Sequence, residues 1–207
     1  MTGLFITFEG GDGSGKTTQA ALLCRWLSQQ GRTTLQTREP GGTELGVEIR
    51  ELVLHRRGEM TPRTEALLYA ADRAQHIATV VRPAIERGEI VVQDRYIDSS
   101  IAYQGVGRDL GAAEVREVSL WATGGLLPDL TILLDLDEGA GQQRLSGSRT
   151  RYDRLEAEQA AFHARVRQAY LDLAGAEPER FLVIDAAGAV EHIAAAVRER
   201  VSALLVR

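Results

Sequence analysis

The chain has 207 residues, a length that suits one domain with a large buried core. Hydrophobic residues make up 44% of it and charged residues 26%, which is ordinary for a globular protein. The net charge of −5 argues against general nucleic-acid binding, which requires a basic surface. Because no apolar run approaches the roughly 18 residues of a membrane span and no signal-peptide pattern is present, we expect a cytoplasmic protein.

Short apolar runs alternate with longer segments of helical periodicity along the chain. Strands are predicted over residues 4–8, 33–37, 90–92, 130–134 and 181–184. Helices are predicted over residues 18–30, 45–53, 112–122, 155–174 and 189–205, with another from Thr61 that bends or restarts at Pro83 and one that ends near residue 145. A polar segment, with no element assigned to it, follows Tyr96 and extends to Gly111. The alternation predicts one α/β domain, residues 1–207, whose five-stranded parallel sheet is flanked by helices on both faces.

The segment between the first strand and the first helix fits the phosphate-binding pattern G-x-x-x-x-G-K-[ST]. Its residues are Gly10, Gly11, Asp12, Gly13, Ser14, Gly15, Lys16 and Thr17. Glycines let successive backbone N–H groups wrap a polyphosphate, and the following helix points its positive end at the same anion. Lys16 is expected to reach the β- and γ-phosphates, and the Thr17 hydroxyl suits Mg²⁺. We therefore predict that residues from Gly10 to Thr18 bind ATP, and the flanking strand and helix argue against an ordinary glycine-rich turn.

Two further charged residues follow a buried strand at the edge of the sheet where ligands bind. Asp94 ends this strand and could hold Mg²⁺ or its water shell, and Arg95 could bind a phosphate with two hydrogen bonds. The alternative is a capping aspartate beside a surface ion pair.

Residues 146–154 are polar and basic and lack an apolar stripe. They are interpreted as a mobile lid that excludes water, in which Arg149 and Arg151 supply positive charge to a phosphoryl group in transfer. Arg154 could instead brace the start of the following helix. A solvated basic loop is the alternative to a lid.

Several stretches, in this order, resemble bacterial thymidylate kinases and together span nearly the whole chain. They are Phe8-Glu9 with the phosphate-binding loop, Thr37-Arg38-Glu39-Pro40-Gly41-Gly42-Thr43, Asp94-Arg95-Tyr96 with residues 99–108, residues 128–135, and residues 153–170. The resemblance implies the fold of the P-loop nucleoside monophosphate kinases. It also implies transfer of the γ-phosphoryl group of ATP to dTMP, which gives dTDP and ADP in dTTP synthesis, and a homodimer.

The same resemblance implies roles for single residues. Asp12 would lie by the 3′-hydroxyl or the waters near the acceptor phosphate, and Arg95 would bind that phosphate. Tyr69 would stack on thymine, although the residues alone favour a core aromatic, and Tyr103 would exclude a 2′-hydroxyl. The remaining dTMP contacts would be Glu39, Pro40, Leu54, Arg73, Ser100 and Gln104, of which Arg73 would bind a thymine carbonyl and Ser100 and Gln104 the edge of the base.

One departure from part of the family concerns position 13, where some members carry an arginine and this chain has Gly13. The chain thus resembles the subclass whose transition-state arginine comes from the lid. The predicted catalytic residues are Asp12, Lys16, Asp94, Arg95, Arg149 and Arg151. A kinase for another nucleoside monophosphate or for a deoxynucleoside is the nearest alternative. A nucleotide-dependent switch is another, but the sequence lacks the N-K-x-D of such GTPases.

Overall fold

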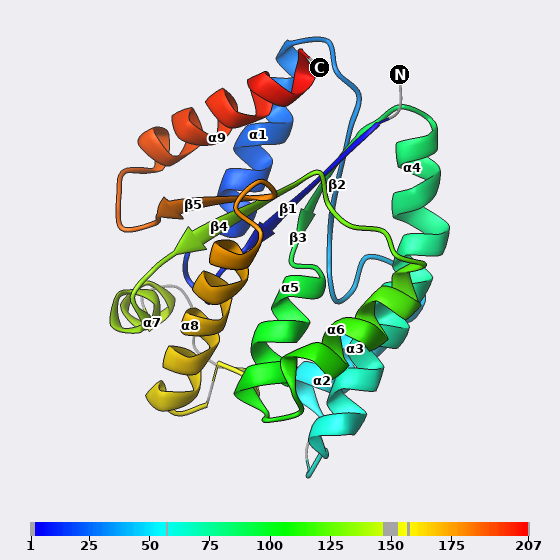
Figure 1. The fold of residues 1–207 in the computed structure, drawn as a ribbon, viewed down its shortest axis with the longest axis vertical. Helices are drawn as coiled ribbons and strands as arrows, with labels where there is room; N and C mark the ends of the chain where they lie inside the picture. The colour runs from blue at the N-terminus through cyan, green and yellow to red at the C-terminus, as the bar shows by residue number, and fades with distance from the viewer. Residues whose placement is uncertain (1–2, 57, 147–152, 157, 207) are drawn as a thin grey trace.

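The structure is a computed structural model that describes residues 3–56, 58–146, 153–156 and 158–206. Five parallel strands form one sheet in the order β2-β3-β1-β4-β5 (Figure 1). They are β1 (Leu4–Glu9), β2 (Thr34–Arg38), β3 (Ile90–Asp94), β4 (Leu130–Asp135) and β5 (Phe181–Asp185). This arrangement confirms the predicted five-stranded parallel sheet.

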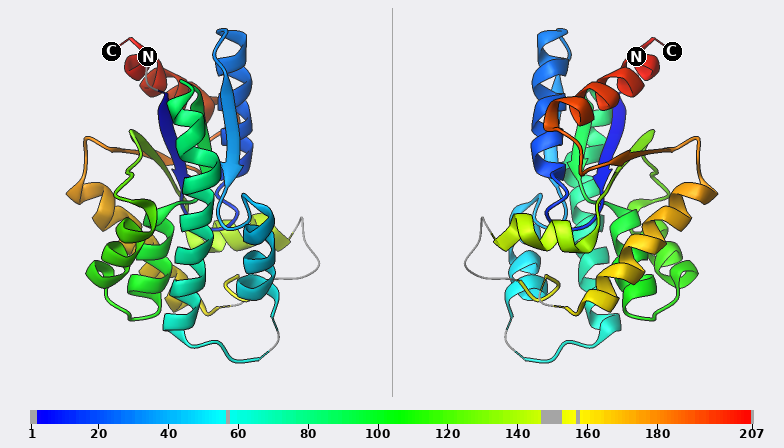
Figure 2. Two further views of the ribbon diagram at one scale, coloured as in Figure 1. Left: turned by 90° about the vertical axis from the view of Figure 1, so that its right-hand side faces the viewer. Right: turned by 90° about the vertical axis from the view of Figure 1, so that its left-hand side faces the viewer.

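One face of the sheet is covered by α1 (Lys16–Gln29) and α9 (Val190–Leu205), which Figures 1 and 2 show side by side. Because successive residues of a strand point to opposite faces, β1 contributes to two cores. Ile6 and Phe8 pack in one buried cluster with Leu23 of α1 and Val197 of α9. Phe5 packs on the opposite face, so the central strand is buried on both sides.

The opposite face and the lower half of the molecule in Figure 1 carry the other helices. They are α2 (Glu44–His55), α3 (Pro62–His76), η1 (Ile77–Val81), α4 (Arg82–Glu86), α5 (Ile97–Ser100), η2 (Ile101–Gly107), α6 (Ala112–Thr123), α7 (Glu138–Ser146) and α8 (Ala160–Ala176). Helices therefore cover both faces of the sheet, as predicted. In the described part of the chain, no helix is both long and apolar enough to cross a membrane.

The helix that begins after Thr61 continues past Pro83 through a π-helical turn, η1. The Arg82 N–H bonds the carbonyl of Ile77, five residues earlier, and Pro83 then lies in the first turn of α4. Proline has no N–H to donate and its ring crowds the carbonyl four residues earlier, so a change of helical register next to Pro83 accommodates it. The expected restart at Pro83 is thus a change of helical register without a break in the chain's direction.

The structure differs from the expected secondary structure in two places. Residues 97–107 form the helical elements α5 and η2, where only a polar segment was predicted. The last long helix before β5 begins at Ala160 and not at residue 155. Residues 154–156 form a turn instead, in which the Asp153 carboxylate accepts the N–H groups of Leu155 at 2.9 Å and Glu156 at 2.8 Å.

The strand register brings the functional segments to one edge of the sheet. Phe8 of β1 is aligned with Asp94 of β3, and Asp94 is aligned with Arg38 of β2. Consequently the loop after β1, the end of β2 and the residues after β3 lie next to one another, at the carboxyl ends of parallel strands.

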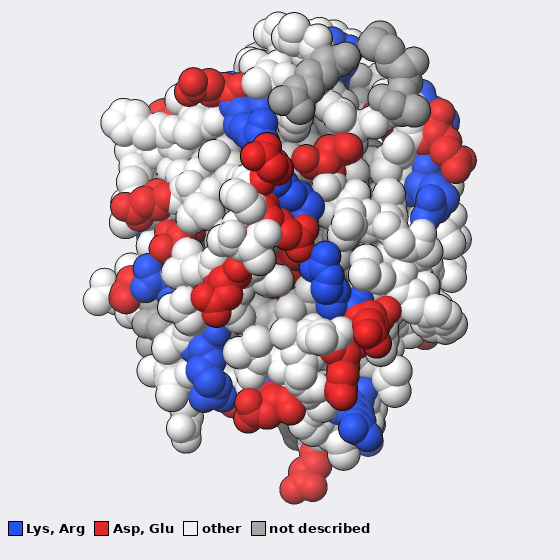
Figure 3. All heavy atoms as spheres, viewed as in Figure 1, with Lys and Arg blue, Asp and Glu red and all other residues white. Residues whose placement is uncertain are grey.

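Acidic and basic side chains are interspersed over the face shown in Figure 3. Ion pairs at the surface include Arg87 with Glu89 at 2.6 Å. Exposed pairs of this kind contribute about 0–1 kcal/mol each, so the fold rests on its apolar clusters.

Candidate active site

The loop between β1 and α1 has a backbone suited to binding phosphate. Gly10, Gly13 and Gly15 have positive φ angles of 132°, 77° and 92°, a region that glycine occupies readily. Because α1 begins at Lys16 without a side-chain cap, the N–H groups of its first turn can bind an anion. The Lys16 amino group donates to the carbonyl oxygens of Gly10 at 3.1 Å and Gly11 at 2.8 Å. The loop thus offers backbone donors and a cation to the same ligand.

Position 13 is closed to any side chain. A Cβ on Gly13 would lie 2.6 Å from the carbonyl oxygen of Gly141 in α7, and φ at Gly13 is already positive. Backbone atoms cannot give way as the end of a flexible side chain can. An arginine at this position is therefore incompatible with the present packing of α7 against the loop.

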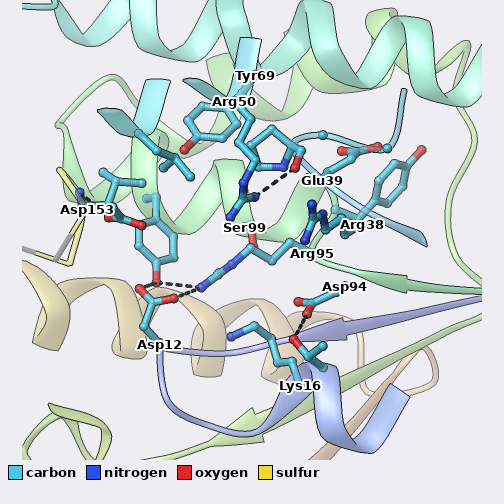
Figure 4. A pocket seen from close by; sticks show the side chains of 18 of the residues that line it. Asp12, Lys16, Arg38, Glu39, Arg50, Tyr69, Asp94, Arg95, Ser99 and Asp153 are labelled. Atoms are coloured by element: carbon cyan, nitrogen blue, oxygen red, sulfur yellow. Dashed lines mark hydrogen bonds and ion pairs between the residues drawn. The ribbon is translucent and has the colours of Figure 1, made fainter. Parts of the chain in front are cut away.

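A cavity of about 840 Å³ opens beside this loop. Its walls come from the loop and α1, from residues 36–42, from α2 and α3, and from residues 94–104. In the view of Figure 4, Arg95 lies between Lys16 on one side and Tyr69 on the other. The phosphate-binding loop and the side chains expected to bind an acceptor thus face the same space.

Arg95 is the central cation of the cavity. Its φ of 68° lies in the left-handed region, which residues with side chains adopt rarely and mostly at functional sites. Its guanidinium donates to Asp12 at 2.5 Å, to the Ser99 hydroxyl at 3.1 Å and to the Tyr170 hydroxyl at 3.3 Å. Burial alone would raise the pKa of Asp12, but Arg95 and Lys16 lower it below its usual value. Burial and the charge of Arg95 in turn lower the pKa of Lys16 to about 8.

A buried carboxyl group, Glu9, supports Arg95 from behind. Glu9 is 0% exposed and accepts hydrogen bonds from the Tyr96 N–H at 2.7 Å, the Ser99 hydroxyl at 2.6 Å and the Tyr170 hydroxyl at 3.0 Å. Burial, together with a neighbouring buried carboxylate, raises the pKa of Glu9 to about 7. Glu9 was not predicted as a site residue, although an acidic residue at the end of an apolar strand indicates one.

Thr17 and Asp94 present oxygen atoms at the start of α1. The Thr17 hydroxyl donates to the Asp94 carboxylate at 2.6 Å, and both residues line the cavity. Within the described ranges, no three His, Cys, Asp or Glu side chains could hold a metal ion together. This donor set fits Mg²⁺, which prefers oxygen and keeps several water or phosphate ligands.

Arg73 lies in a buried hydrogen-bond network. It is 2% exposed and donates to Glu39 at 2.8 Å, to Ser119 at 3.2 Å, and to Ser100 at 3.1 Å. A fourth hydrogen bond, at 3.2 Å, goes to the carbonyl of Tyr96. The structure therefore brings Glu39, Arg73 and Ser100 together, with most of the Arg73 donors engaged by the protein.

Aromatic and apolar side chains line the part of the cavity around η2. Leu54 and Tyr69 lie on the cavity wall and are 7% and 8% exposed. The Tyr103 hydroxyl lies 3.4 Å from the Asp12 carboxylate, and Gln104 follows it on the π-helical turn η2. Single turns of π-helix occur often at functional sites.

Arg38 and Arg50 are cavity residues that the sequence analysis did not single out. Arg50 donates to the Pro40 carbonyl at 3.0 Å, whereas the described residues give the Arg38 guanidinium no hydrogen bond. Both side chains extend toward Arg95 in Figure 4. The position of Arg38 at the end of β2, in register with Asp94, could have revealed it. Arg38, Arg50 and Arg95 thus lie together in one part of the cavity and suit an anionic ligand.

The family model described as thymidylate kinase matches residues 8–197. The chain belongs to the thymidylate kinase family. It is 72% identical over 198 residues to the thymidylate kinase of Leifsonia xyli subsp. xyli, which covers 96% of this chain and 94% of that one. The thymidylate kinase of Clavibacter michiganensis subsp. michiganensis is 68% identical over 205 residues, which are 99% and 97% of the two chains.

The crystal structure of thymidylate kinase from Ehrlichia chaffeensis has a similar fold, with a TM-score of 0.74 at 33% identity. The match covers 89% of this chain and 93% of that one. The resemblance stated from the sequence motifs is thereby confirmed, together with the P-loop kinase fold.

Arg149 and Arg151, the predicted lid arginines of this thymidylate kinase family member, lie outside the described residues. Arg154 is described, and it does not brace the start of α8, which begins six residues later. Its side chain donates to the Val53 carbonyl at 3.0 Å and pairs with Glu65, so it connects the residues before α8 to α2 and α3.

Proposed function

We propose that the chain transfers the γ-phosphoryl group of ATP to dTMP and forms dTDP and ADP, a step toward dTTP. The observation that carries this proposal is the single cavity that joins the phosphate-binding loop to Tyr69 and Leu54, with Arg95 between them. Membership of the thymidylate kinase family supports dTMP as the acceptor. A cytoplasmic location, where both nucleotides are available, belongs to the same proposal.

Catalysis would consist of positioning and charge stabilisation. Lys16 and the backbone N–H groups of its loop bind the triphosphate, while Arg38, Arg50 and Arg95 bind the acceptor phosphate. Asp12 holds the Arg95 guanidinium in place through their 2.5 Å contact. Because the acceptor phosphate is already ionised near neutral pH, the chain needs no strong general base.

Thr17 and Asp94 would hold Mg²⁺, which would neutralise part of the phosphate charge. Their oxygen atoms meet at the start of α1, beside the expected position of the triphosphate. Thr17 therefore serves the metal through its side chain and the phosphate through its N–H.

The base and sugar of dTMP would occupy the remaining part of the cavity. Tyr69 offers an aromatic face and Leu54 an apolar surface to the pyrimidine ring. Tyr103 would lie where a ribose 2′-hydroxyl projects, which favours deoxyribose. Arg73, Ser100 and Gln104 would bind the polar edge of the base, and Glu39 and Pro40 would form the adjoining wall.

Arg149 and Arg151 are proposed to supply the transition-state charge from a lid over residues 146–154. The closed position at Gly13 supports this assignment, because no arginine can come from the phosphate-binding loop itself.

A homodimer is proposed from a face of exposed apolar side chains on adjacent helices. Leu45 and Val47 of α2, Leu67 of α3, and Val118 and Trp121 of α6 are 37–86% exposed. α3 packs against both α2 and α6, so these side chains lie on one bundle of helices. A second copy of the chain would bury them.

An acceptor panel tests the proposed reaction. ADP release is measured with ATP and Mg²⁺ alone, and then with dTMP, dUMP, dCMP, dAMP, dGMP or thymidine added. Release should depend on an acceptor and be fastest with dTMP. A faster reaction with another nucleotide would change the acceptor, and equal release without any acceptor would indicate a hydrolytic switch.

A further inference from the structure

Glu65 of α3 is a buried carboxylate on which three side chains converge. It is 0% exposed, and its Oε1 accepts a hydrogen bond from Gln104 Nε2 at 2.8 Å. Arg108 Nη2 lies 3.4 Å from its Oε2, and the Arg154 guanidinium also pairs with Oε2. The proposed reaction gives Glu65 no role, although it contacts a residue that lines the cavity.

The contact with Glu65 fixes the orientation of the Gln104 side-chain amide, that is, the positions of its NH₂ group and its carbonyl oxygen. A carboxylate accepts hydrogen bonds and donates none, so the NH₂ group of Gln104 must point toward Glu65. Gln104 is 2% exposed, and no donor among the described residues bonds its Oε1. The Gln104 carbonyl oxygen is therefore an acceptor that the protein leaves open to the cavity, where a bound ligand can replace water as its partner.

We propose that Glu65 is a positioning residue for base selection, because it holds the Gln104 amide with its carbonyl oxygen toward N3 of the pyrimidine. This inference rests on the proposed function. Thymine and uracil carry an N–H at N3, which donates to this oxygen. Cytosine carries an unprotonated nitrogen there, so two acceptors face each other and both remain unpaired. A buried polar group left unpaired in this way discriminates strongly between substrates.

Glu65 prevents the Gln104 amide from flipping, which a glutamine without this partner could do. A glutamine amide can turn over and present NH₂ where its oxygen was, which would suit cytosine. The carboxylate excludes the turned amide, since an oxygen would then face an oxygen at 2.8 Å. The two arginines beside Glu65 keep its negative charge compensated in the interior.

The variant Glu65→Gln tests the proposal, because a glutamine at position 65 can either donate to or accept from Gln104. Initial rates give kcat/KM for dTMP, dUMP and dCMP, and inhibition of dTMP phosphorylation gives the affinity for dCMP. We expect the preference for dTMP over dCMP to fall at least tenfold, mainly through KM and the inhibition constant. The preference for dTMP over dUMP should stay unchanged, because these two bases share the same edge.

Glu158→Gln is the matched control. Glu158 pairs with Arg108 at 2.6 Å, so this variant removes a carboxylate from the same arginine without touching Gln104. Its preference for dTMP over dCMP should equal that of the wild type. An equal loss with dTMP and dCMP in Glu65→Gln would show a purely structural role and overturn the proposal.

Gln104→Met gives a second test that does not depend on the folding of Glu65→Gln. Methionine keeps the length of the side chain and removes the hydrogen-bond acceptor. The preference for dTMP over dCMP should therefore fall in this variant as well. An unchanged preference in Gln104→Met overturns the proposal. A wild-type chain that does not phosphorylate dTMP would instead refute the proposed function, so the two failures are distinguishable.

Discussion

Lys16 is the only lysine in the 207-residue sequence, and its amino group lies against carbonyl oxygens of its own loop. Because burial and Arg95 lower its pKa to about 8, a fraction of Lys16 is neutral above that pH. A bound triphosphate favours the charged form, so binding above pH 8 takes up a proton.

We therefore predict that the affinity for ATP falls as pH rises from 8 to 9.5, where the phosphates are already fully ionised. Isothermal titration in buffers of different ionisation enthalpy would measure both the affinity and the proton uptake. In Lys16→Arg the cation stays charged throughout this range, so the decline should disappear. A wild-type affinity that does not change with pH would contradict the expected pKa.

Glu9 links pH to stability. Its pKa is raised from 4.5 to about 7 in the folded chain, so between these values the folded state holds a proton that the unfolded state has lost. The resulting stabilisation is complete below pH 4.5 and is lost as pH rises to 7, by at most about 1.4 kcal/mol per pH unit.

Glu9→Gln cannot titrate and should lack this loss. Urea unfolding of both proteins at pH 5, 6 and 7 should show the wild type becoming less stable relative to the variant as pH rises. A constant difference between the two proteins would show that Glu9 does not titrate in this range.

At the scale of the elements, residues 146–154 carry the proposed catalytic arginines. We predict that replacing Arg149 or Arg151 by alanine lowers kcat by roughly 10³-fold in at least one case, with little change in dTMP affinity. Steady-state rates and dTMP titrations would separate the two effects. Arg63→Ala, at an exposed position of α3, is the control. A change confined to KM in both variants would assign the lid to substrate binding.

The strands could be predicted because their apolar runs are continuous, as in β3 and β4, which are buried on both faces. The helical elements α5 and η2 could not, because their polar residues are buried against distant partners. Asp98 pairs with Arg180 at 2.7 Å, and Ser99 donates to Glu9, 90 residues earlier. An interior built from such pairs has no apolar periodicity.

The candidate site also contains residues that the sequence predicts and residues that only the folded structure reveals. The loop around Lys16 follows a local pattern, so the sequence indicates it directly. Glu65 and Arg50 have no local pattern, and their relation to the cavity depends on how α2 and α3 pack. The pairing of Glu65 with Gln104, 39 residues later, becomes visible only in the folded chain.

For the whole molecule, the exposed side chains of α2, α3 and α6 predict a dimer. Trp121 is 86% exposed, and a charge in its place should prevent association. Light scattering after size-exclusion chromatography should give a dimeric wild type and a monomeric Trp121→Glu. Val206→Glu changes an equally exposed apolar residue outside this face, at 89%, and should remain dimeric. A wild-type monomer would refute the assembly.

The close approach of the loop at Gly13 to α7 at Gly141 restricts both positions to glycine, although they are far apart in the sequence. Any relative that bears a side chain at the first position must hold its α7 farther from the loop, or shift the loop toward the sheet. The identities of these two residues should consequently vary as a pair among homologues. The distance between loop and helix could then be inferred for a relative before its coordinates are determined.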